Sequence, residues 1–340
     1  MRSTPALALL ACALAGCSIE VGPRDGAAAA KPGQAQTVRV YSSLYKEVID
    51  ALQPALDAAL ARSSPGTRVE WFQSGSEKVA TRLDAELATG GSPGDLLLTS
   101  DPTYYARLKR EGRLPAYVSP RALRQPRQLL DPDGAWAVAR ISTMVLAVSP
   151  RLAAAARPAS FRDLAAAGSG RVAIGDPLSS GTNYTTVSTL AARLGGVWFS
   201  QLKAQGAVVA GGNASVLSRI ESGESDAGWV LLANLLAARA RGEKIALVVP
   251  ADGAVLVPGP IALLPHARHS EAARAVYDAL LSDEVQRVLI EKGYQHSADP
   301  ALPPPPGAPT LSQLLAKSTP PSPLPPAQVK AHFSAIFFGR

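Results

Sequence analysis

Small polar residues follow a short apolar segment near the middle of the sequence. Residues 172–174 (Val-Ala-Ile) have the composition of a buried strand, Gly175-Asp176-Pro177 ends it, and residues 179–182 (Ser-Ser-Gly-Thr) are suited to begin a helix. The first turn of a helix carries unpaired backbone N–H groups and the positive end of the helix dipole. With hydroxyl groups beside them, these donors suit a carboxylate, phosphate or phosphonate. A well-capped helix that binds nothing has the same pattern, so one such segment does not decide the matter.

The same pattern follows several other expected strands. Residues 37–41, 67–72, 95–99 and 207–210 read as strands, and each is followed by small polar residues and an expected helix. In α/β proteins ligands bind at the carboxyl ends of parallel strands. The candidate ligand-binding residues, which would donate from hydroxyl and backbone N–H groups, are Ser42, Ser43, Ser74, Gly75, Ser76, Ser100, Ser179, Ser180, Gly181, Thr182, Asn213, Ala214 and Ser215.

Asp226 and Trp229 are candidates from a further expected strand end at residues 225–229. Asp226 could bind an amine or orient a hydroxyl group, and Trp229 could stack on a ligand. An ordinary strand-end residue and a core aromatic are the commoner roles for these two residue types. Arg140 and Lys78 have the charge to neutralise an anion, but we expect each to be a solvated charge.

The sequence lacks the patterns that are typical of a catalytic site. Its four histidines, His266, His269, His296 and His332, occur late in the chain and outside every expected strand end. It has no Gly-x-Ser-x-Gly motif, no phosphate-loop lysine and no dinucleotide-binding glycine pattern. His266 and His269 have no third ligand nearby in the sequence, which makes a metal site a weak prediction. We therefore expect a binding protein and not an enzyme, with no cofactor and no metal.

Strands and helices are expected to alternate along most of the chain, which predicts an α/β fold with mostly parallel sheets and helices on both faces. Two long β-rich segments, residues 134–148 and 245–264, flank a central insert of residues 141–250. This order predicts two lobes joined by two crossing strands. The first lobe would comprise residues 37–140 and 251–298, and the insert would form the second. Helix starts from both lobes would then line the cleft between them.

Composition supports a soluble globular protein. The chain has 340 residues, of which 47% are hydrophobic and 18% charged, enough for two domains with sizeable cores. The formal charge is +7, but no basic run is interleaved with aromatic residues. We therefore expect no nucleic-acid partner.

Residues 1–17 have the features of a signal peptide. Arg2 precedes an apolar segment at 6–15, and Leu14-Ala15-Gly16-Cys17 ends it. The spacing resembles a bacterial lipoprotein signal, which implies cleavage before Cys17 and lipidation of its sulfur; a plain secretory signal cleaved nearby is the alternative. Cys17 would then be the one cysteine of the mature chain, which excludes an intrachain disulfide. Residues 18–36 are rich in Ala, Gly and Pro and are expected to form a flexible tether.

The C-terminal residues 299–340 are rich in proline, including Pro303 to Pro306, which predicts an extended connector. Val329, Phe333, Ile336 and Phe337 fall on one face of a short helix. We expect this helix to pack against a lobe, and a partner-binding helix is the alternative.

From Thr37 to about Tyr294 the order of elements resembles that of periplasmic solute-binding proteins of ABC importers. The resemblance is carried by segments 40–43 (VYSS), 94–99 (GDLLLT), 171–177 (RVAIGDP), 261–264 (IALL), 270–273 (SEAA) and 281–286 (LSDEVQ). The branch it resembles contains ferric-ion, thiamine, phosphonate and sugar-phosphate binders. The resemblance implies a type II fold whose two α/β lobes close on a small anionic solute. It also implies delivery to an inner-membrane permease and a periplasmic location; we expect a lipid-anchored monomer.

Two alternatives share this cleft. Ferric binders of the family use adjacent tyrosines after the strand that corresponds here to residues 226–230, whereas this chain has Trp229-Val-Leu-Leu-Ala-Asn234. Valine and leucine cannot ligate Fe(III), which favours an organic anion, although Tyr41, Tyr45 and Tyr184 keep a ferric ion or ferric chelate open. The other alternative is a periplasmic sensor that presents its liganded state to a membrane kinase.

Overall fold

The computed structural model describes residues 36–319, 322 and 324–339. The expected signal peptide, the lipidation site Cys17 and all of the expected tether except Gln36 lie outside the described residues. None of the helices in the described part is both long and apolar enough to cross a membrane.

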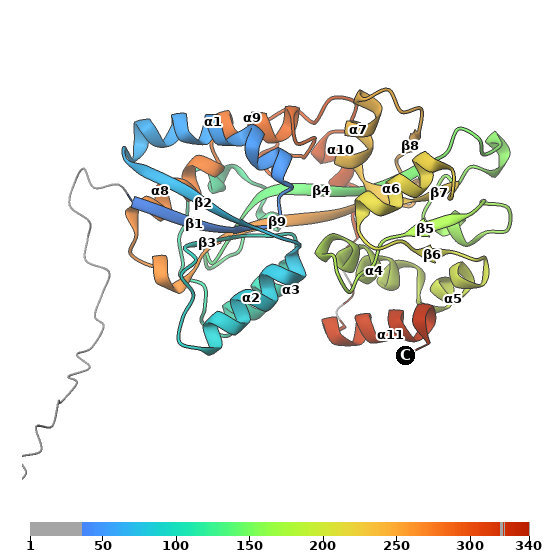
Figure 1. The fold of residues 1–340 in the computed structure, drawn as a ribbon, viewed down its shortest axis with the longest axis horizontal. Helices are drawn as coiled ribbons and strands as arrows, with labels where there is room; N and C mark the ends of the chain where they lie inside the picture. Colours follow the sequence, from blue (N-terminus) through green and yellow to red (C-terminus); the bar gives the residue numbers. More distant parts are fainter. Residues whose placement is uncertain (1–35, 320–321, 323, 340) are drawn as a thin grey trace, which may run out of the picture.

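The first lobe lies on the left in Figure 1 and is built from alternating strands and helices. Its parallel strands follow the order β2-β1-β3, and β9 adds to β3 in the antiparallel direction. The elements are β1 (Gln36–Ser42), α1 (Lys46–Ser63), β2 (Thr67–Gln73), α2 (Ser76–Ala88), β3 (Leu96–Leu98), α3 (Pro102–Arg110), β9 (Val255–Leu263), α8 (Glu271–Leu280) and α9 (Asp283–Glu291).

The second lobe is an insert between β4 (Ala137–Val148) and β9. Strand β5 pairs in parallel with β6 on one side and with β7 on the other. The elements of the insert are β5 (Val172–Ile174), α4 (Gly181–Leu194), α5 (Gly196–Ala204), β6 (Val208–Val209), α6 (Asn213–Ser222), β7 (Ala227–Leu231), α7 (Leu232–Ala240) and β8 (Ala246–Val248).

Two strands, β4 and β9, run through both lobes, so a single sheet continues from one lobe to the other. They pair with each other over residues 137–144 of β4, and the end of β4 then pairs with β7 and β8. This confirms the expected α/β fold with two lobes and two crossing strands. One detail differs from the prediction: residues 246–248 form β8, which pairs only with β4, and the second crossing is β9 alone.

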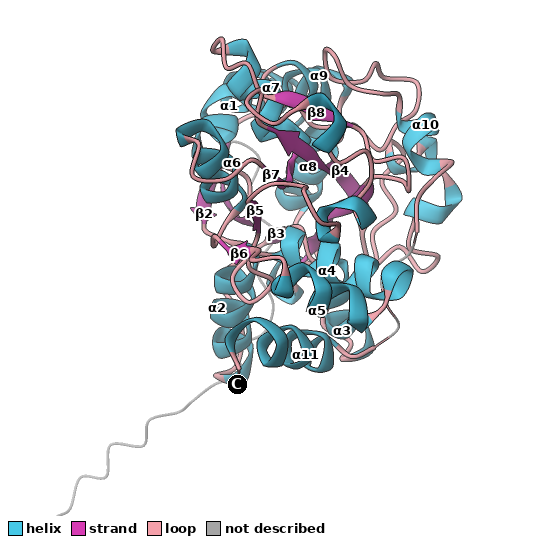
Figure 2. Cartoon of the chain, turned by 90° about the vertical axis from the view of Figure 1, so that its right-hand side faces the viewer, coloured by secondary structure: helices cyan, strands magenta, loops and turns pink. Residues whose placement is uncertain are grey.

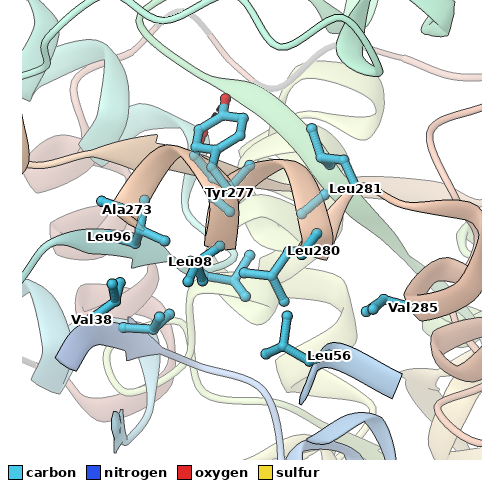
Figure 3. Close-up of a cluster of buried hydrophobic side chains, with 14 of the residues drawn as sticks. Val38, Leu56, Leu96, Leu98, Ala273, Tyr277, Leu280, Leu281 and Val285 are labelled. Atoms are coloured by element: carbon cyan, nitrogen blue, oxygen red, sulfur yellow. Dashed lines mark hydrogen bonds between the residues drawn. The ribbon is translucent and has the colours of Figure 1, made fainter. Parts of the chain in front are cut away.

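Each lobe has one hydrophobic core on either face of the sheet, because successive side chains of a strand point to opposite faces. In the first lobe Val38 and Val40 of β1 pack beneath α1, α8 and α9, whereas Tyr41 faces α2 and α3. Figure 3 shows α8 lying over the strands, with Ala273 next to Leu96 and the Tyr277 hydroxyl pointing away from Leu96 and Leu98; all belong to one core cluster. In the second lobe Trp229 faces α4 and α5, and Val230 faces α6 and α7.

The C-terminal segment packs back on the folded protein. Helix α10 (Leu311–Leu315) places Leu311 against Val138 and Ile141 of β4. Helix α11 (Pro326–Phe338) lies below α4 and α5 (Figures 1 and 2), and its apolar face is buried in the core of the second lobe through Val329, Phe333 and Phe337. The expectation that this helix packs against a lobe is confirmed.

Helix α11 also contacts the first lobe. The ammonium group of Lys330 is 2.8 Å from a carboxylate oxygen of Glu77 on α2.

Candidate ligand-binding site between the lobes

A cavity of about 200 Å³ lies between the two lobes. The first lobe contributes residues that follow β1, β2 and β3, and the second lobe contributes residues that follow β5 and β6 together with the last residue of β7. The lining residues are Ser43, Tyr45, Gly75, Ser76, Ser100, Arg140, Ser142, Ser179, Ser180, Gly181, Thr182, Gly212, Asn213, Leu231 and Gln295.

Helix N-termini from both lobes converge on this cavity. Helix α2 begins at Ser76, α4 at Gly181 and α6 at Asn213, and all three residues belong to the lining. The Ser180 hydroxyl caps α4 by accepting a hydrogen bond from the backbone N–H of Asn183 at 3.4 Å. Three positive helix ends therefore face one small volume, which favours a negatively charged occupant.

Arg140 provides a full positive charge in the same cavity. The side chain comes from β4, and the residue is only 3% exposed. Its Nη2 donates to the hydroxyl oxygens of Ser100 at 2.8 Å and Ser43 at 3.2 Å, while Nε and Nη1 are buried without a partner. Within the described part of the chain it forms no salt bridge.

Burial lowers the pKa of Arg140 to about 10, because desolvation penalises the charged form. The group nevertheless keeps its proton at neutral pH. A cation without a counter-charge at the wall of a cavity is suited to bind an anion.

The expectation that Arg140 is a solvated charge is therefore wrong, whereas Lys78 is exposed as expected. A signal was present in the sequence: Arg140 is the only charged residue in the apolar segment 135–148. A lone charge within a fully buried crossing strand has to meet either a counter-charge or a polar cavity.

Side chains of the second lobe complete the polar wall. Thr182 Oγ1 accepts a hydrogen bond from Asn213 Nδ2 at 2.8 Å and lies 3.0 Å from Ser180 Oγ. Asn213 Oδ1 and Gln295 Oε1 are buried and have no partner within the described residues. The cavity therefore offers acceptors for ligand hydroxyl or amine groups beside the donors of Arg140.

The two lobes touch at the edge of this cavity, and a glycine makes the contact possible. A Cβ atom added at Gly181 would lie 2.8 Å from the Ser100 carbonyl oxygen and 3.0 Å from Ser76 Cβ. Gly181 belongs to the second lobe and the other two residues to the first. The structure thus has the lobes closed on each other at the N-terminus of α4.

Nine of the candidate residues from the sequence lie together in this cavity. They are Ser43, Gly75, Ser76, Ser100, Ser179, Ser180, Gly181, Thr182 and Asn213. The sequence interpretation missed Ser142, Gly212, Leu231 and Gln295, and it considered Tyr45 only as a possible contact for iron.

Four other candidates lie outside the lining of the cavity. The Ser42 hydroxyl is buried and accepts a hydrogen bond from the backbone N–H of Leu44 at 3.0 Å. Ser74 is partly buried beyond the end of β2, Ser215 is exposed on α6, and Ala214 lines a neighbouring hollow.

Asp226 and Trp229 also lie outside it, for a reason that the topology supplies. Strand β7 extends to Leu231, so Asp226 precedes the strand and does not end it. There its carboxylate binds the Arg171 guanidinium at 3.0 Å, and this hydrogen bond lowers the pKa of Asp226. Trp229 is buried in the core and donates from Nε1 to Asn183 Oδ1 at 3.1 Å.

The tyrosines that kept ferric binding open are distributed differently. Tyr45 lines the cavity, but Tyr41 donates its hydroxyl to Glu86 at 2.9 Å in the core of the first lobe. Tyr184 is buried in the core of the second lobe. Within the described residues, no group of three or more His, Cys, Asp or Glu side chains is arranged to hold a metal ion.

Comparison with known proteins agrees with this fold and with the resemblance noted in the sequence. Residues 37–295 match the family model described as bacterial extracellular solute-binding protein. This match spans most of the chain, and the chain belongs to that family. No curated sequence matches.

Several solved structures share the fold. The substrate-binding protein of an ABC transporter from Agrobacterium tumefaciens superposes with a TM-score of 0.74 at 20% identity, covering 89% of this chain and 93% of that one. Iron-bound HitA from Pseudomonas aeruginosa superposes with a TM-score of 0.72 at 20% identity, covering 88% of this chain and 98% of that one. AfuA from Actinobacillus pleuropneumoniae with fructose-6-phosphate bound superposes with a TM-score of 0.71 at 21% identity, covering 82% of this chain and 90% of that one. The chain is thus an extracellular solute-binding protein, which is a binding protein and not an enzyme.

Proposed function

We propose that this protein captures a small anionic solute, a phosphorylated, phosphonate or carboxylate compound, between its lobes and delivers it to an ABC permease. The observation that carries the proposal is Arg140, a buried guanidinium at the wall of the cavity that forms no salt bridge within the described residues. Burying an unpaired charge costs several kcal/mol. A bound anion beside the guanidinium would offset that cost, and a hydrogen bond to a charged group is worth about 1.5–3 kcal/mol.

The same geometry supports a closing motion on the ligand. Arg140 and Ser100 approach the cavity from the first lobe or the crossing strand, and Thr182 and Asn213 approach it from the second. An anion held by both sets stabilises the closed arrangement over an open one, which shifts the population toward closure. Strands β4 and β9 connect the lobes and are the natural hinge. The permease would recognise the closed shape.

The chemistry of the walls favours an organic anion over ferric ion. The lining provides hydroxyls, amides, one guanidinium and the single phenol of Tyr45, with no carboxylate or imidazole. Fe(III) requires several anionic oxygen ligands, whereas a phosphate or carboxylate is matched by donors.

The N-terminal signal and the family together suggest where the protein acts. We propose that the signal at residues 1–17 directs export, that Cys17 is lipidated, and that the protein acts in the periplasm as a monomer tethered to the membrane. Mass spectrometry of the membrane-bound protein would detect the diacylglycerol on Cys17. A mature protein that begins at another residue and carries no lipid would refute the lipid anchor.

Thermal unfolding with a panel of ligands tests the function. The panel contains sugar phosphates, phosphoglycerates, phosphonates, carboxylates, thiamine and ferric citrate. A ligand at a hundred times its Kd adds about 2.7 kcal/mol to the free energy of unfolding, a shift of several degrees.

Arg140→Met should abolish this shift. Arg239→Met removes an exposed arginine at the end of α7 and should leave the shift unchanged. Stabilisation by ferric ion alone, or a shift that survives Arg140→Met, would contradict the proposal.

A further inference from the structure

A second hollow, of about 550 Å³, adjoins the anion cavity on the far side of Tyr45. Tyr45 is the residue before α1 and contributes to the walls of both hollows. It is 40% exposed, so part of this residue is free to contact a ligand. We refer to the 200 Å³ cavity as the inner chamber and to the 550 Å³ hollow as the outer chamber.

Three segments supply neighbouring residues to both chambers, so the two chambers lie side by side between the lobes. On α6, Asn213 lines the inner chamber, and Ala214 lines the outer one. Leu231, the residue before α7, lines the inner chamber, and Ala233 of α7 lines the outer one. After α9, Gln295 lines the inner chamber and Tyr294 lines the outer one. The first lobe and the second lobe both contribute to each chamber.

The walls of the two chambers differ in chemistry. The inner chamber is lined mainly by hydroxyl, amide and guanidinium groups. The outer chamber has apolar surface from Val48, Leu217 and Ala237, with the Tyr294 side chain beside them. It also contains charge, including the Arg241–Glu221 pair at 3.5 Å. An anionic group fits the first environment, and an organic group with an apolar face fits the second.

The backbone at Tyr294 adds a second observation. Its φ is 50°, a left-handed conformation that side chains other than glycine seldom adopt. Such strain persists where the surrounding structure holds the residue in place, and it is frequent at binding sites. Here the strained residue, Tyr294, lines the outer chamber, and the next residue, Gln295, lines the inner one.

We propose that the solute is bipartite, with an anionic head bound by Arg140 in the inner chamber and a ring-sized organic substituent that passes Tyr45 into the outer chamber. This rests on the proposed anion function and narrows it. The cargo class is an organic phosphate, phosphonate or carboxylate, and not an inorganic oxyanion. Tyr45 acts as the specificity-determining residue, because it belongs to the lining of both chambers and its aromatic ring offers a face on which the substituent packs.

Isothermal titration with matched pairs of probes tests this inference. Each pair shares one head and differs by a phenyl ring: inorganic phosphate with phenyl phosphate, methylphosphonate with phenylphosphonate, and acetate with phenylacetate. In at least one pair the ring-bearing member should bind at least about tenfold more tightly, equivalent to 1.4 kcal/mol.

Three variants assign the effect to the outer chamber. Tyr45→Ala should remove the preference for the ring-bearing member, and Tyr45→Phe should keep the preference. Ala237→Trp fills the outer chamber from α7 and should weaken only the ring-bearing member. Arg140→Met should weaken both members.

The outcomes separate this inference from the function on which it rests. Equal binding of the two members in every pair that binds would overturn the bipartite ligand and leave the anion cavity in place. A preference that survives both Tyr45→Ala and Ala237→Trp would also overturn it. Failure of every probe to bind the wild-type protein would refute the anion function, and the inference with it.

Discussion

Replacing Gly181 with alanine should weaken ligand binding without weakening the fold. The added Cβ would lie 2.8 Å from the Ser100 carbonyl oxygen and 3.0 Å from Ser76 Cβ, both on the opposite lobe. Ordinary contact begins near 3.4 Å, so the lobes have to separate by about 0.6 Å at this point. The Ser100 atom belongs to the backbone and cannot rotate away.

The cost follows from this overlap. Overpacking of a well-packed contact costs about 1–3 kcal/mol, and if closure bears all of it the Kd rises about 5- to 150-fold. The open protein has no such contact, and exchanging glycine for alanine at a compatible position stabilises a chain by about 0.4–1 kcal/mol. The ligand-free protein should therefore unfold at the same temperature as the wild type or slightly higher.

Calorimetry measures both quantities. Isothermal titration gives the Kd of any ligand found in the panel, and scanning calorimetry gives the unfolding temperature without ligand. Gly196→Ala is the matched control, because Gly196 begins α5 as Gly181 begins α4 and its added Cβ meets no atom within 4 Å. Unchanged affinity in Gly181→Ala would refute closure at this contact. If the ligand-free protein lost as much free energy of unfolding as the complex loses free energy of binding, the defect would lie in folding.

Three further predictions concern stability. Arg140→Met should raise the unfolding temperature of the ligand-free protein, because it removes an unpaired buried charge; a lower temperature in scanning calorimetry would contradict the absence of an internal counter-charge. Phe333→Ala should cost about 3–5 kcal/mol in urea unfolding, because the ring is buried and stacks on Phe337 at 4.5 Å; a loss below about 1 kcal/mol would mean that α11 is not docked. Burial lowers the pKa of His296, so the unfolded chain binds more protons once the pH falls below about 6.5, and the free energy of unfolding should fall there. His296→Gln should flatten this fall in unfolding experiments between about pH 7.5 and 5.5, and identical slopes would exclude His296 as its source.

Local sequence features were sufficient to predict the class of fold and much of the inner chamber. Strand and helix starts depend on short-range preferences, such as the Ser180 cap and the apolar run at 172–174, and these can be read along the chain. Because parallel strands bring their carboxyl ends to one edge, Ser43, Ser76 and Thr182 could be grouped without knowing a single tertiary contact.

Other features depend on contacts between distant segments, and only the tertiary structure decided them. The apolar run after Asp226 is compatible with a strand that ends at Trp229 or at Leu231; pairing of β7 with β4 out to Leu231 settles it and leaves Asp226 at the far edge. Whether Arg140 is solvated, paired or unpaired depends on which side chains β1, β3 and the second lobe bring to it.

The division of the cleft by Tyr45 has the same origin. The sequence by itself determined the polar helix starts, because each is a local property of a few residues. The unpaired charge, the closed contact at Gly181 and the two chambers arise only when two lobes, built from separate stretches of chain, meet across β4 and β9.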